Sequence, residues 1–197
     1  MKKTSILKLI LLSVVFLVGL TYLTVEPPKK IENKDILLKD LPKTVNLVGY
    51  EDREFNTNSI IKENTIIFVG NFESLAIAND FIELIKGKRS NIVIVSNISD
   101  APWFIKKWQA NKKSLELRGD TDIPWIYDKD GSIRYFLQIK STDPLKYTVF
   151  EVLKDKNVKK IHQGSVIKGT IDGKMSKEDI KKELSDVLNK IGDKDGK

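Results

Sequence analysis

The sequence predicts one α/β domain, built on a mixed sheet with helices on both faces and preceded by a separate apolar N-terminal segment. Two short β-branched runs are separated by a segment of helical period, which is the pattern of a βαβ unit with parallel strands. A later pair of strand-like runs flanks a turn and precedes an amphipathic segment, which predicts a hairpin and a last helix. The length of 197 residues accommodates one such domain and an appendage, but not two large domains.

The first 25 residues combine a basic start with an uncharged apolar run over residues 9–25. The run has 17 residues, and a helix that spans a bilayer needs roughly 17 to 25. It is longer than the core of a typical signal peptide, and no Ala-x-Ala cleavage site follows it. We therefore predict an uncleaved signal anchor over residues 1–25, with a removed signal peptide as the alternative.

Both interpretations of this segment export the rest of the chain. An anchor predicts a single-pass protein of the bacterial inner (cytoplasmic) membrane, whose domain faces the periplasm or the exterior. The membrane is then a predicted partner, contacted through the N-terminal helix. Cleavage would instead leave a soluble periplasmic protein. A lipoprotein anchor is excluded, because lipidation there needs a cysteine and the chain has none.

The remainder of the chain divides into a linker, a domain and a tail. Residues 26–45 are predicted to be a linker, in which Pro27 and Pro28 favour a stiff extended segment. Such a segment would space the domain from the lipid. The domain is predicted over residues 46–192, followed by a tail over residues 193–197.

The first half of the domain changes between strand-like and helix-like periods. Residues 45–50 and 57–61 predict short strands or a hairpin. Residues 65–69 form a β-branched run that is typical of a buried central strand. Apolar residues then recur at helical spacing over residues 75–85, and residues 91–95 predict a second buried strand. The two strands run the same way, because the helix between them acts as a crossover.

A second helix is predicted to begin at a cap on Ser99 or Asp100 and to end near Leu117. Aromatic residues cluster in this helix, and their spacing favours a core stripe, with an exposed partner-binding patch as the alternative. A further aromatic residue in the next segment either packs under a helix or forms part of a recognition surface. The patch would comprise Trp103, Trp108 and Trp125.

The second half of the domain is rich in turns. Apolar and aromatic residues flank the turn at 128–131, which predicts a hairpin, or a strand followed by a turn, over residues 124–136. A clearer hairpin joins residues 147–153 to residues 158–162, with Asn157 free to adopt the left-handed conformation.

A last amphipathic helix follows, with an apolar stripe over residues 180–191. Ser176 with Asp179 three residues later resembles a capping box at its start. The resulting order is βαβ, helix, irregular segment, hairpin and helix. A thioredoxin-like fold requires this order, because its sheet is parallel in the first half and antiparallel in the second.

Composition removes several classes of chemistry. The chain has no cysteine and one histidine, His162. Disulfides, thiolate nucleophiles and thiolate metal sites are therefore excluded, and no metal or other cofactor is predicted. The formal net charge is +7, but three of the lysines behind it lie in the leader and the others are spread along the chain. No nucleic-acid partner is predicted from such a distribution.

Three segments resemble a known family. Residues 68–72 followed by a helix look like the approach to the redox loop in membrane-anchored periplasmic thioredoxins of the TlpA kind and in peroxiredoxins. Residues 127–133 resemble the segment before the closing hairpin of these proteins, and residues 148–164 resemble the hairpin itself. The resemblance covers roughly residues 60–190 and extends to the YtfJ-like family of periplasmic thioredoxin-fold proteins.

The departures from this family decide what the resemblance implies. The two redox cysteines would fall at Glu73 and Ala76, and the cis-proline would fall at Tyr147. Thiol exchange needs a thiolate at a helix N-terminus and a second thiol that resolves the mixed disulfide. The resemblance therefore implies the fold without thiol–disulfide oxidoreductase or peroxidase activity.

Two functions remain open from the sequence. The first is a non-catalytic module that binds or helps to assemble an unidentified partner protein through the former redox groove, and for it no catalytic residue is assigned. The second is an enzyme that uses Glu73, Asp128 or His162 as acid or base in a small-molecule pocket. The predicted groove residues of the binding module are Asn71, Phe72, Glu73, Ala76, Tyr147 and Thr148.

Overall fold

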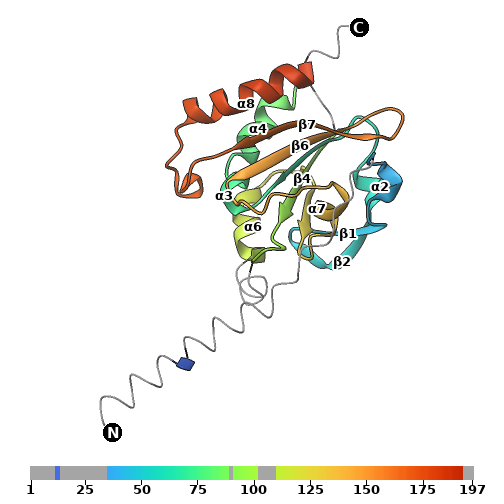
Figure 1. Cartoon of the computed structure of the whole chain (residues 1–197), viewed down its shortest axis with the longest axis horizontal. Coiled ribbons are helices and arrows are strands. Elements are labelled where there is room, and N and C mark those ends of the chain that lie inside the picture. Colours follow the sequence, from blue (N-terminus) through green and yellow to red (C-terminus); the bar gives the residue numbers. More distant parts are fainter. Residues whose placement is uncertain (1–11, 14–34, 89–90, 102–109, 193–197) are drawn as a thin grey trace.

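The computed structural model describes residues 12–13, 35–88, 91–101 and 110–192. Its domain is built on a seven-stranded sheet with the order β2-β1-β5-β4-β3-β6-β7 (Figure 1). The strands are β1 (Thr44–Leu47), β2 (Tyr50–Asn56), β3 (Ile66–Gly70), β4 (Ile92–Asn97), β5 (Trp125–Asp128), β6 (Lys146–Val152) and β7 (Val158–Ser165).

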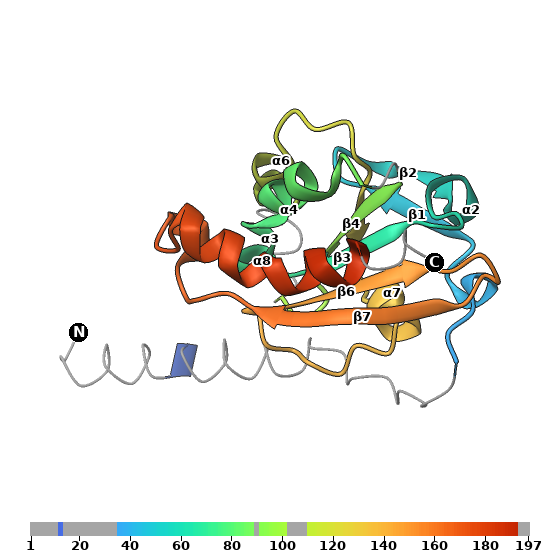
Figure 2. The same ribbon diagram turned by 90° about the horizontal axis from the view of Figure 1, so that it is seen from above.

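Helices lie on both faces of this sheet, as the sequence predicts (Figure 2). Helices α3, α4, α6 and α8 contribute to one hydrophobic core, which we call the first core. Helix α7 and the segment around η1 contribute to the second core, on the opposite face. The bounds are η1 (Leu38–Asp40), α2 (Thr57–Ile60), α3 (Phe72–Leu75), α4 (Ala78–Ile85), α6 (Ala110–Arg118), α7 (Ser132–Phe136), η2 (Thr170–Asp172) and α8 (Lys177–Gly192).

Four neighbouring strands, β4, β3, β6 and β7, have the predicted thioredoxin-like arrangement. Strand β3 pairs in parallel with β4, whereas β6 runs antiparallel to β3 and β7 runs antiparallel to β6. Strand β5 adds a third parallel strand beside β4, and the β1–β2 hairpin extends the sheet beyond it. The protein therefore has a mixed α/β, thioredoxin-like fold.

Side-chain alternation along β3 explains why both faces are covered. All residues of this strand are buried, because successive side chains point to opposite faces. Phe68 enters the first core, where its ring centroid lies 5.0 Å from that of Phe81 on α4. Val69 enters the second core with Val95 of β4. A run of apolar residues without polar alternation is what such a doubly covered strand needs.

Several predicted elements are confirmed with small changes. The strands expected at residues 65–69 and 91–95 are β3 and β4. The helix expected over residues 75–85 is divided, since α3 ends at Leu75 and α4 begins at Ala78. The predicted cap of the last helix is present, because Asp179 N donates to the Ser176 hydroxyl at 3.1 Å.

Residues 57–61 correct the prediction of a second short strand, because most of this segment forms helix α2. The side chain of Asn56 accepts a hydrogen bond from Asn58 N at 2.9 Å. The Thr57 hydroxyl donates to the Pro42 carbonyl. Asn and Thr side chains that bond nearby backbone groups favour a helix start over continued strand pairing.

Of the two alternatives predicted for residues 124–136, the strand followed by a turn is confirmed and the hairpin is wrong. Strand β5 is followed by helix α7, and no second strand forms in residues 129–136. Gly131 takes the left-handed conformation, with φ of 74°. The Asp128 carboxylate accepts from Ile133 N at 3.1 Å and from Arg134 N at 3.0 Å. The carboxylate thus satisfies backbone donors of the first helical turn.

The turn of the β6–β7 hairpin also differs in one detail. Lys156, rather than Asn157, has the positive φ, at 65°. The Asp155 carboxylate accepts from Asn157 N at 3.0 Å and from Asn157 Nδ2 at 2.8 Å. This Asx-type turn holds Asn157 in place and shifts the left-handed residue by one position.

The predicted signal anchor apart from residues 12–13, residues 26–34 of the predicted linker, and the tail lie outside the described residues. In the described part of the chain, no helix has the length and apolarity to cross a bilayer. The last residues of the predicted linker pack against the domain. Val158 N donates to the Ile36 carbonyl at 2.8 Å, and Leu38 N donates to the Lys156 carbonyl at 2.8 Å. Leu41 is buried in the second core.

Candidate functional site

Polar residues gather where the parallel strands end. Asn71 directly follows β3, Asn97 ends β4 and Asp128 ends β5. The carboxyl ends of parallel strands meet at one edge of the sheet, and open α/β sheets commonly bind ligands there. We call this edge the carboxyl edge and take it as the candidate site.

Asp128 is a buried carboxylate at the carboxyl edge. Its side chain is 2% exposed, and burial raises its pKa from 3.8 to about 6 against the lowering effect of the Arg134 and Ile133 backbone donors. Both carboxylate oxygens already accept hydrogen bonds from these two backbone groups. Asp128 is therefore engaged in holding helix α7 rather than presented to a ligand.

Arg134 connects the segment after β4 to the segment after α7. It is 8% exposed, and its Nη1 lies 2.5 Å from Asp100 Oδ2. The same nitrogen donates to the Ser99 hydroxyl at 3.3 Å, while Nε donates to the Ile139 carbonyl at 3.3 Å. Ser99 in turn donates from its backbone and its hydroxyl to Asn97 Oδ1. This network connects the end of β4 to the segment that leads into β6.

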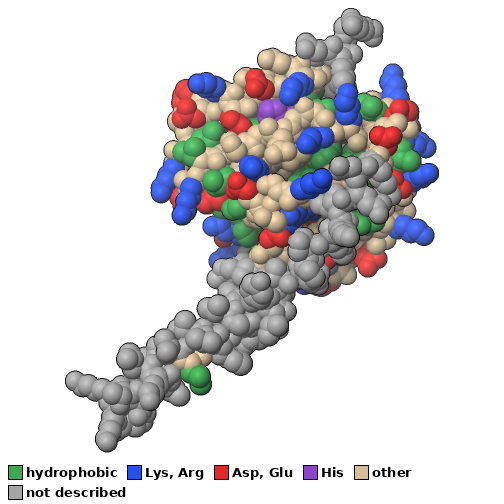
Figure 3. Space-filling view, in the orientation of Figure 1, with side chains coloured by type: hydrophobic (Ala, Val, Ile, Leu, Met, Phe, Trp, Pro, Cys, Tyr) green, Lys and Arg blue, Asp and Glu red, His purple; other side chains and the backbone are tan. Residues whose placement is uncertain are grey.

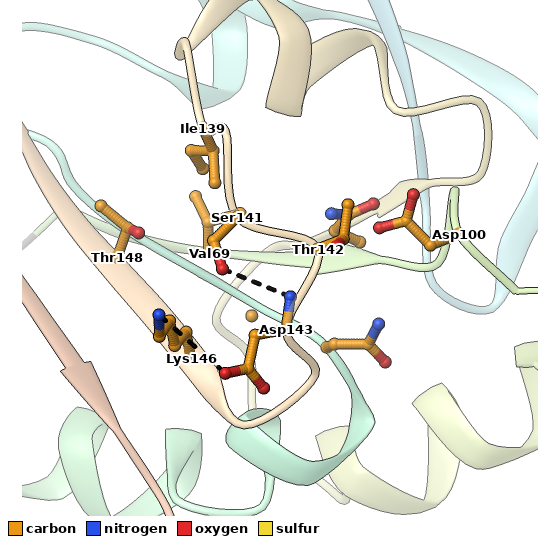
Figure 4. Close-up of a pocket in the computed structure, with 11 residues that line it drawn as sticks. Val69, Asp100, Ile139, Ser141, Thr142, Asp143, Lys146 and Thr148 are labelled. Atoms are coloured by element: carbon orange, nitrogen blue, oxygen red, sulfur yellow. Dashed lines mark hydrogen bonds and ion pairs between the residues drawn. The ribbon is translucent and has the colours of Figure 1, made fainter. Parts of the chain in front are cut away.

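A small pocket opens between these groups, and Figure 4 shows its lining. We call it the edge pocket. Its volume of about 20 Å³ holds a water or one small group rather than a whole ligand. Asp143 N donates to Ser141 Oγ at 3.3 Å, and Lys146 Nζ lies 4.0 Å from Asp143 Oδ2. The polar residues around it are Asn71, Asn97, Asp100, Ser141, Thr142, Asp143, Lys146 and Thr148.

A larger hollow adjoins the edge pocket on the face of the second core. It has a volume of about 640 Å³ and shares four lining residues with the edge pocket. The shared residues are Ile139, Ser141, Lys146 and Thr148. Three lysines lie along it, so we call it the lysine groove; they are Lys140, Lys146 and Lys160. The two hollows together run from the carboxyl edge across β6 towards β7.

Two of the six predicted groove residues line the edge pocket, and two others, Phe72 and Ala76, lie at the two ends of α3. Asn71 and Thr148 line the edge pocket. Phe72 is half-buried against the first core, and its backbone N donates to Asn71 Oδ1 at 2.6 Å. Ala76 follows the last residue of α3 and is also half-buried. Among them, Asn71 and Thr148 are the residues that the structure brings together at a hollow.

Glu73 has a different role from the one expected of a groove residue. Its Oε2 accepts from Gly169 N at 3.1 Å and from Ile171 N at 3.3 Å. The side chain thus ties α3 to the loop before α8. Glu73 does not line the edge pocket. The residue that the sequence resemblance aligns with the first redox cysteine therefore has a structural role.

Tyr147 is packed inside the molecule. It is 1% exposed, and its ring stacks on Phe68 with centroids 4.9 Å apart. Its hydroxyl donates to Glu183 Oε1 at 3.1 Å and lies 3.4 Å from His162 Nε2. Burial and the neighbouring Glu183 carboxylate raise the Tyr147 pKa far above its usual value. The residue at the cis-proline position therefore belongs to the first core under α8.

His162 lies at the rim of this packed region. Burial lowers its pKa below the usual 6.5, as does the positive charge of Lys190, while Glu183 and Asp186 act in the opposite direction. Its Nδ1 is buried and has no hydrogen-bond partner in the described part of the chain. A hollow between β7 and α8 includes His162, but the described residues contain no cluster of metal-ligating side chains there or elsewhere.

The predicted aromatic patch divides in two. Trp125 is 1% exposed and belongs to the first core, so it packs under a helix rather than forming a recognition surface. Trp103 and Trp108 lie outside the described residues.

Comparisons with known proteins concern the fold. No protein-family model matches the sequence, and no curated protein matches it. Among solved structures, MTB dsbF is 13% identical, with a TM-score of 0.45 and coverage of 76% of this chain and 96% of that one. A secreted Mycobacterium tuberculosis disulfide oxidoreductase homologous to E. coli DsbE is 12% identical, with a TM-score of 0.43 and coverage of 68% and 95%. Xanthomonas campestris peroxiredoxin Q is 12% identical, with a TM-score of 0.38 and coverage of 72% and 92%.

Proposed function

We propose that this chain is an exported, membrane-anchored thioredoxin-fold protein without thiol redox chemistry, which binds a partner protein at its carboxyl edge. The main support for the proposal is that the domain has a polar pocket at its carboxyl edge but no cysteine. A polar hollow remains where β3 and β4 end, between Asn71, Asn97 and Thr148. The chain has no cysteine that could react there.

Rigid support of the hollow favours binding. The Arg134 network holds the Ile139 end of the lining segment, and the Asn71 side chain caps α3. Residues that are fixed before a partner arrives lose less conformational freedom on association, which favours affinity. A small polar pocket of this kind suits recognition of one side chain of a protein segment.

The arrangement of titratable groups weighs against the alternative of acid–base catalysis. Asp128 and His162 have shifted pKa values, but they lie on β5 and β7. Four strand spacings of about 4.8 Å separate these strands, so the two groups are about 19 Å apart across the sheet. Glu73 is occupied by two backbone donors. A general acid and a general base must both reach one bound substrate, which Asp128 and His162 cannot do at this separation.

Export and anchoring rest on the sequence. The apolar run over residues 9–25, preceded by three lysines, is the support for placing the domain outside the cytoplasm. An anchored domain would meet its partner at the membrane surface, where two-dimensional confinement raises the local concentration of both proteins.

Photo-crosslinking of the full chain in native membranes tests the proposed function. A photoreactive residue at Thr142, which is exposed and lines the edge pocket, is expected to capture one specific protein. The Thr148→Arg variant fills the pocket and is expected to reduce this adduct. Lys113 on α6 is exposed and serves as the control position. The same adducts from both positions, or none from Thr142, would contradict binding at the carboxyl edge.

A further inference from the structure

The lysine groove has features that indicate the chemistry of its occupant. It is an open hollow of about 640 Å³ between β6, β7 and the segment after α7. Its floor is apolar, since Leu137 and Phe150 belong to the second core and line the groove from below. Figure 3 looks onto this face and shows basic side chains over β6 and β7.

The charged side chains that line the groove are all positive. Lys140, Lys146 and Lys160 line it, and no acidic side chain does so within the described part of the chain. The carboxylate of Asp143, in the adjoining edge pocket, lies 4.0 Å from Lys146. Both of these side chains are more than 40% exposed, so their attraction is screened by water. A ligand carboxylate could therefore compete for Lys146 at little cost.

We propose that the lysine groove docks an extended acidic segment of the partner protein, with carboxylates against the lysines and apolar side chains against Leu137 and Phe150. This inference rests on the proposed function, because the groove continues the edge pocket through Ser141 and Thr148. Complementary charge gives such a segment its orientation and raises its rate of association.

Other polyanions fit the groove less well. Single-stranded nucleic acids need aromatic side chains on which bases stack, and the groove's aromatic residue, Phe150, is 1% exposed. A bilayer surface is broad and contacts projecting side chains, whereas these lysines border a hollow. An extended peptide is narrow enough to enter the hollow and carries both kinds of side chain that its lining requires.

Fluorescence anisotropy with the purified full chain tests the proposal. The probe is a fluorescein-labelled peptide of ten residues with six glutamates and four leucines, and the same peptide with glutamines is the control. The Lys146→Gln/Lys160→Gln variant is expected to weaken binding of the acidic peptide by about tenfold or more at low salt. The Lys112→Gln/Lys113→Gln variant removes the same charge from α6 and is expected to weaken binding less than twofold.

The outcomes separate this inference from the function on which it rests. Equal weakening by both double variants, or equal binding of the two peptides, would overturn the proposal, because either result indicates unspecific attraction or apolar binding. Absence of acidic-peptide binding together with groove-dependent binding to phosphatidylglycerol vesicles would also overturn it, in favour of a lipid surface. A specific Thr142 crosslink would survive each of these results, so the edge pocket would remain a binding site.

Discussion

Tyr147 and Thr148 are neighbours on β6, yet they belong to two regions with opposite properties. Tyr147 lies in the first core beneath α8, where its ring and hydroxyl are both engaged. Thr148 lies on the other face and lines the edge pocket and the lysine groove. We call these regions the closed face and the open face of β6. Tyr147, which the sequence resemblance aligns with a cis-proline, lies in the core, while the adjacent Thr148 borders a hollow.

The two faces differ in how their side chains are engaged. On the closed face, Glu73 ties α3 to the loop before α8, and the hydrogen bond from Tyr147 to Glu183 ties β6 to α8. On the open face, Lys146 makes an exposed ion pair. Substitutions should therefore change stability on the closed face and binding on the open face.

The largest effect is expected for Tyr147→Ala. Removing a buried aromatic side chain leaves a cavity and typically costs about 3–5 kcal/mol. Denaturant unfolding of the purified chain measures this cost. Tyr50 is 47% exposed, so Tyr50→Ala serves as the control and is expected to cost far less. Equal costs for the two variants would remove the distinction between the closed face and an ordinary surface.

Asp128, at the carboxyl edge, is expected to make the stability of the fold depend on pH. Because its folded pKa of about 6 exceeds the unfolded value of 3.8, the folded state binds the proton more tightly. The contribution of this group to the free energy of unfolding therefore falls as pH rises from about 4 to about 6, by about 1–3 kcal/mol. Unfolding of the wild type and Asp128→Asn at several pH values measures this slope.

The contribution of His162 to the free energy of unfolding changes with pH in the opposite direction, over a neighbouring range. Its lowered pKa means that the folded state disfavours the protonated ring, so its contribution is present above pH 6.5 and is lost as pH falls. The His162→Gln variant separates the pH dependence due to His162 from that due to Asp128.

For the Asp128 prediction, a pH slope that is the same in Asp128→Asn and in the wild type would show that the buried carboxyl titrates normally.

Gly164 tests how tightly the closed face is packed. A Cβ at this position would lie 2.3 Å from Glu183 Oε1 and 2.5 Å from Tyr147 Cζ. Gly164→Ala is expected to cost about 1–2 kcal/mol in a thermal or denaturant melt. Gly87 has no neighbour within 4 Å of the same position, so Gly87→Ala is the matched control. A neutral Gly164→Ala would mean that α8 moves away from β7 readily.

Glu73→Ala should have a smaller effect on stability. It removes the acceptor for Gly169 N and Ile171 N, and the loss of such hydrogen bonds costs on the order of 1 kcal/mol. The Thr142 crosslink is expected to persist in this variant. Unchanged stability with loss of the crosslink would return Glu73 to the binding site that the sequence predicts for it.

Local pattern was sufficient to predict much of the fold. The runs that became β3 and β4 each contain four successive apolar residues, at 66–69 and 92–95, and the stripe of α8 recurs at helical spacing. Helix α7 was missed because its first turn depends on the Asp128 carboxylate, which bonds backbone groups five and six residues away. Flanking aromatic residues are equally typical of a hairpin, so spacing alone did not distinguish the two.

The candidate site was harder to predict, because it depends on register and long-range contacts. Adjacent strand residues face opposite sides, so Tyr147 and Thr148 could not both line one groove. The Glu73 tether joins residues 96 and 98 positions apart in the chain. Lys140, Lys146 and Lys160 come from a loop and two strands, and no spacing in the sequence indicates that they share a hollow.

Crosslinking from two positions on opposite sides of β6 tests whether the partner meets the open face. Photoreactive residues are placed at Thr142, on the open side, and at Ser185 on α8, which borders the hollow on the closed side. The account predicts a specific partner adduct from Thr142 and none from Ser185. A specific adduct from Ser185 with none from Thr142 would contradict it.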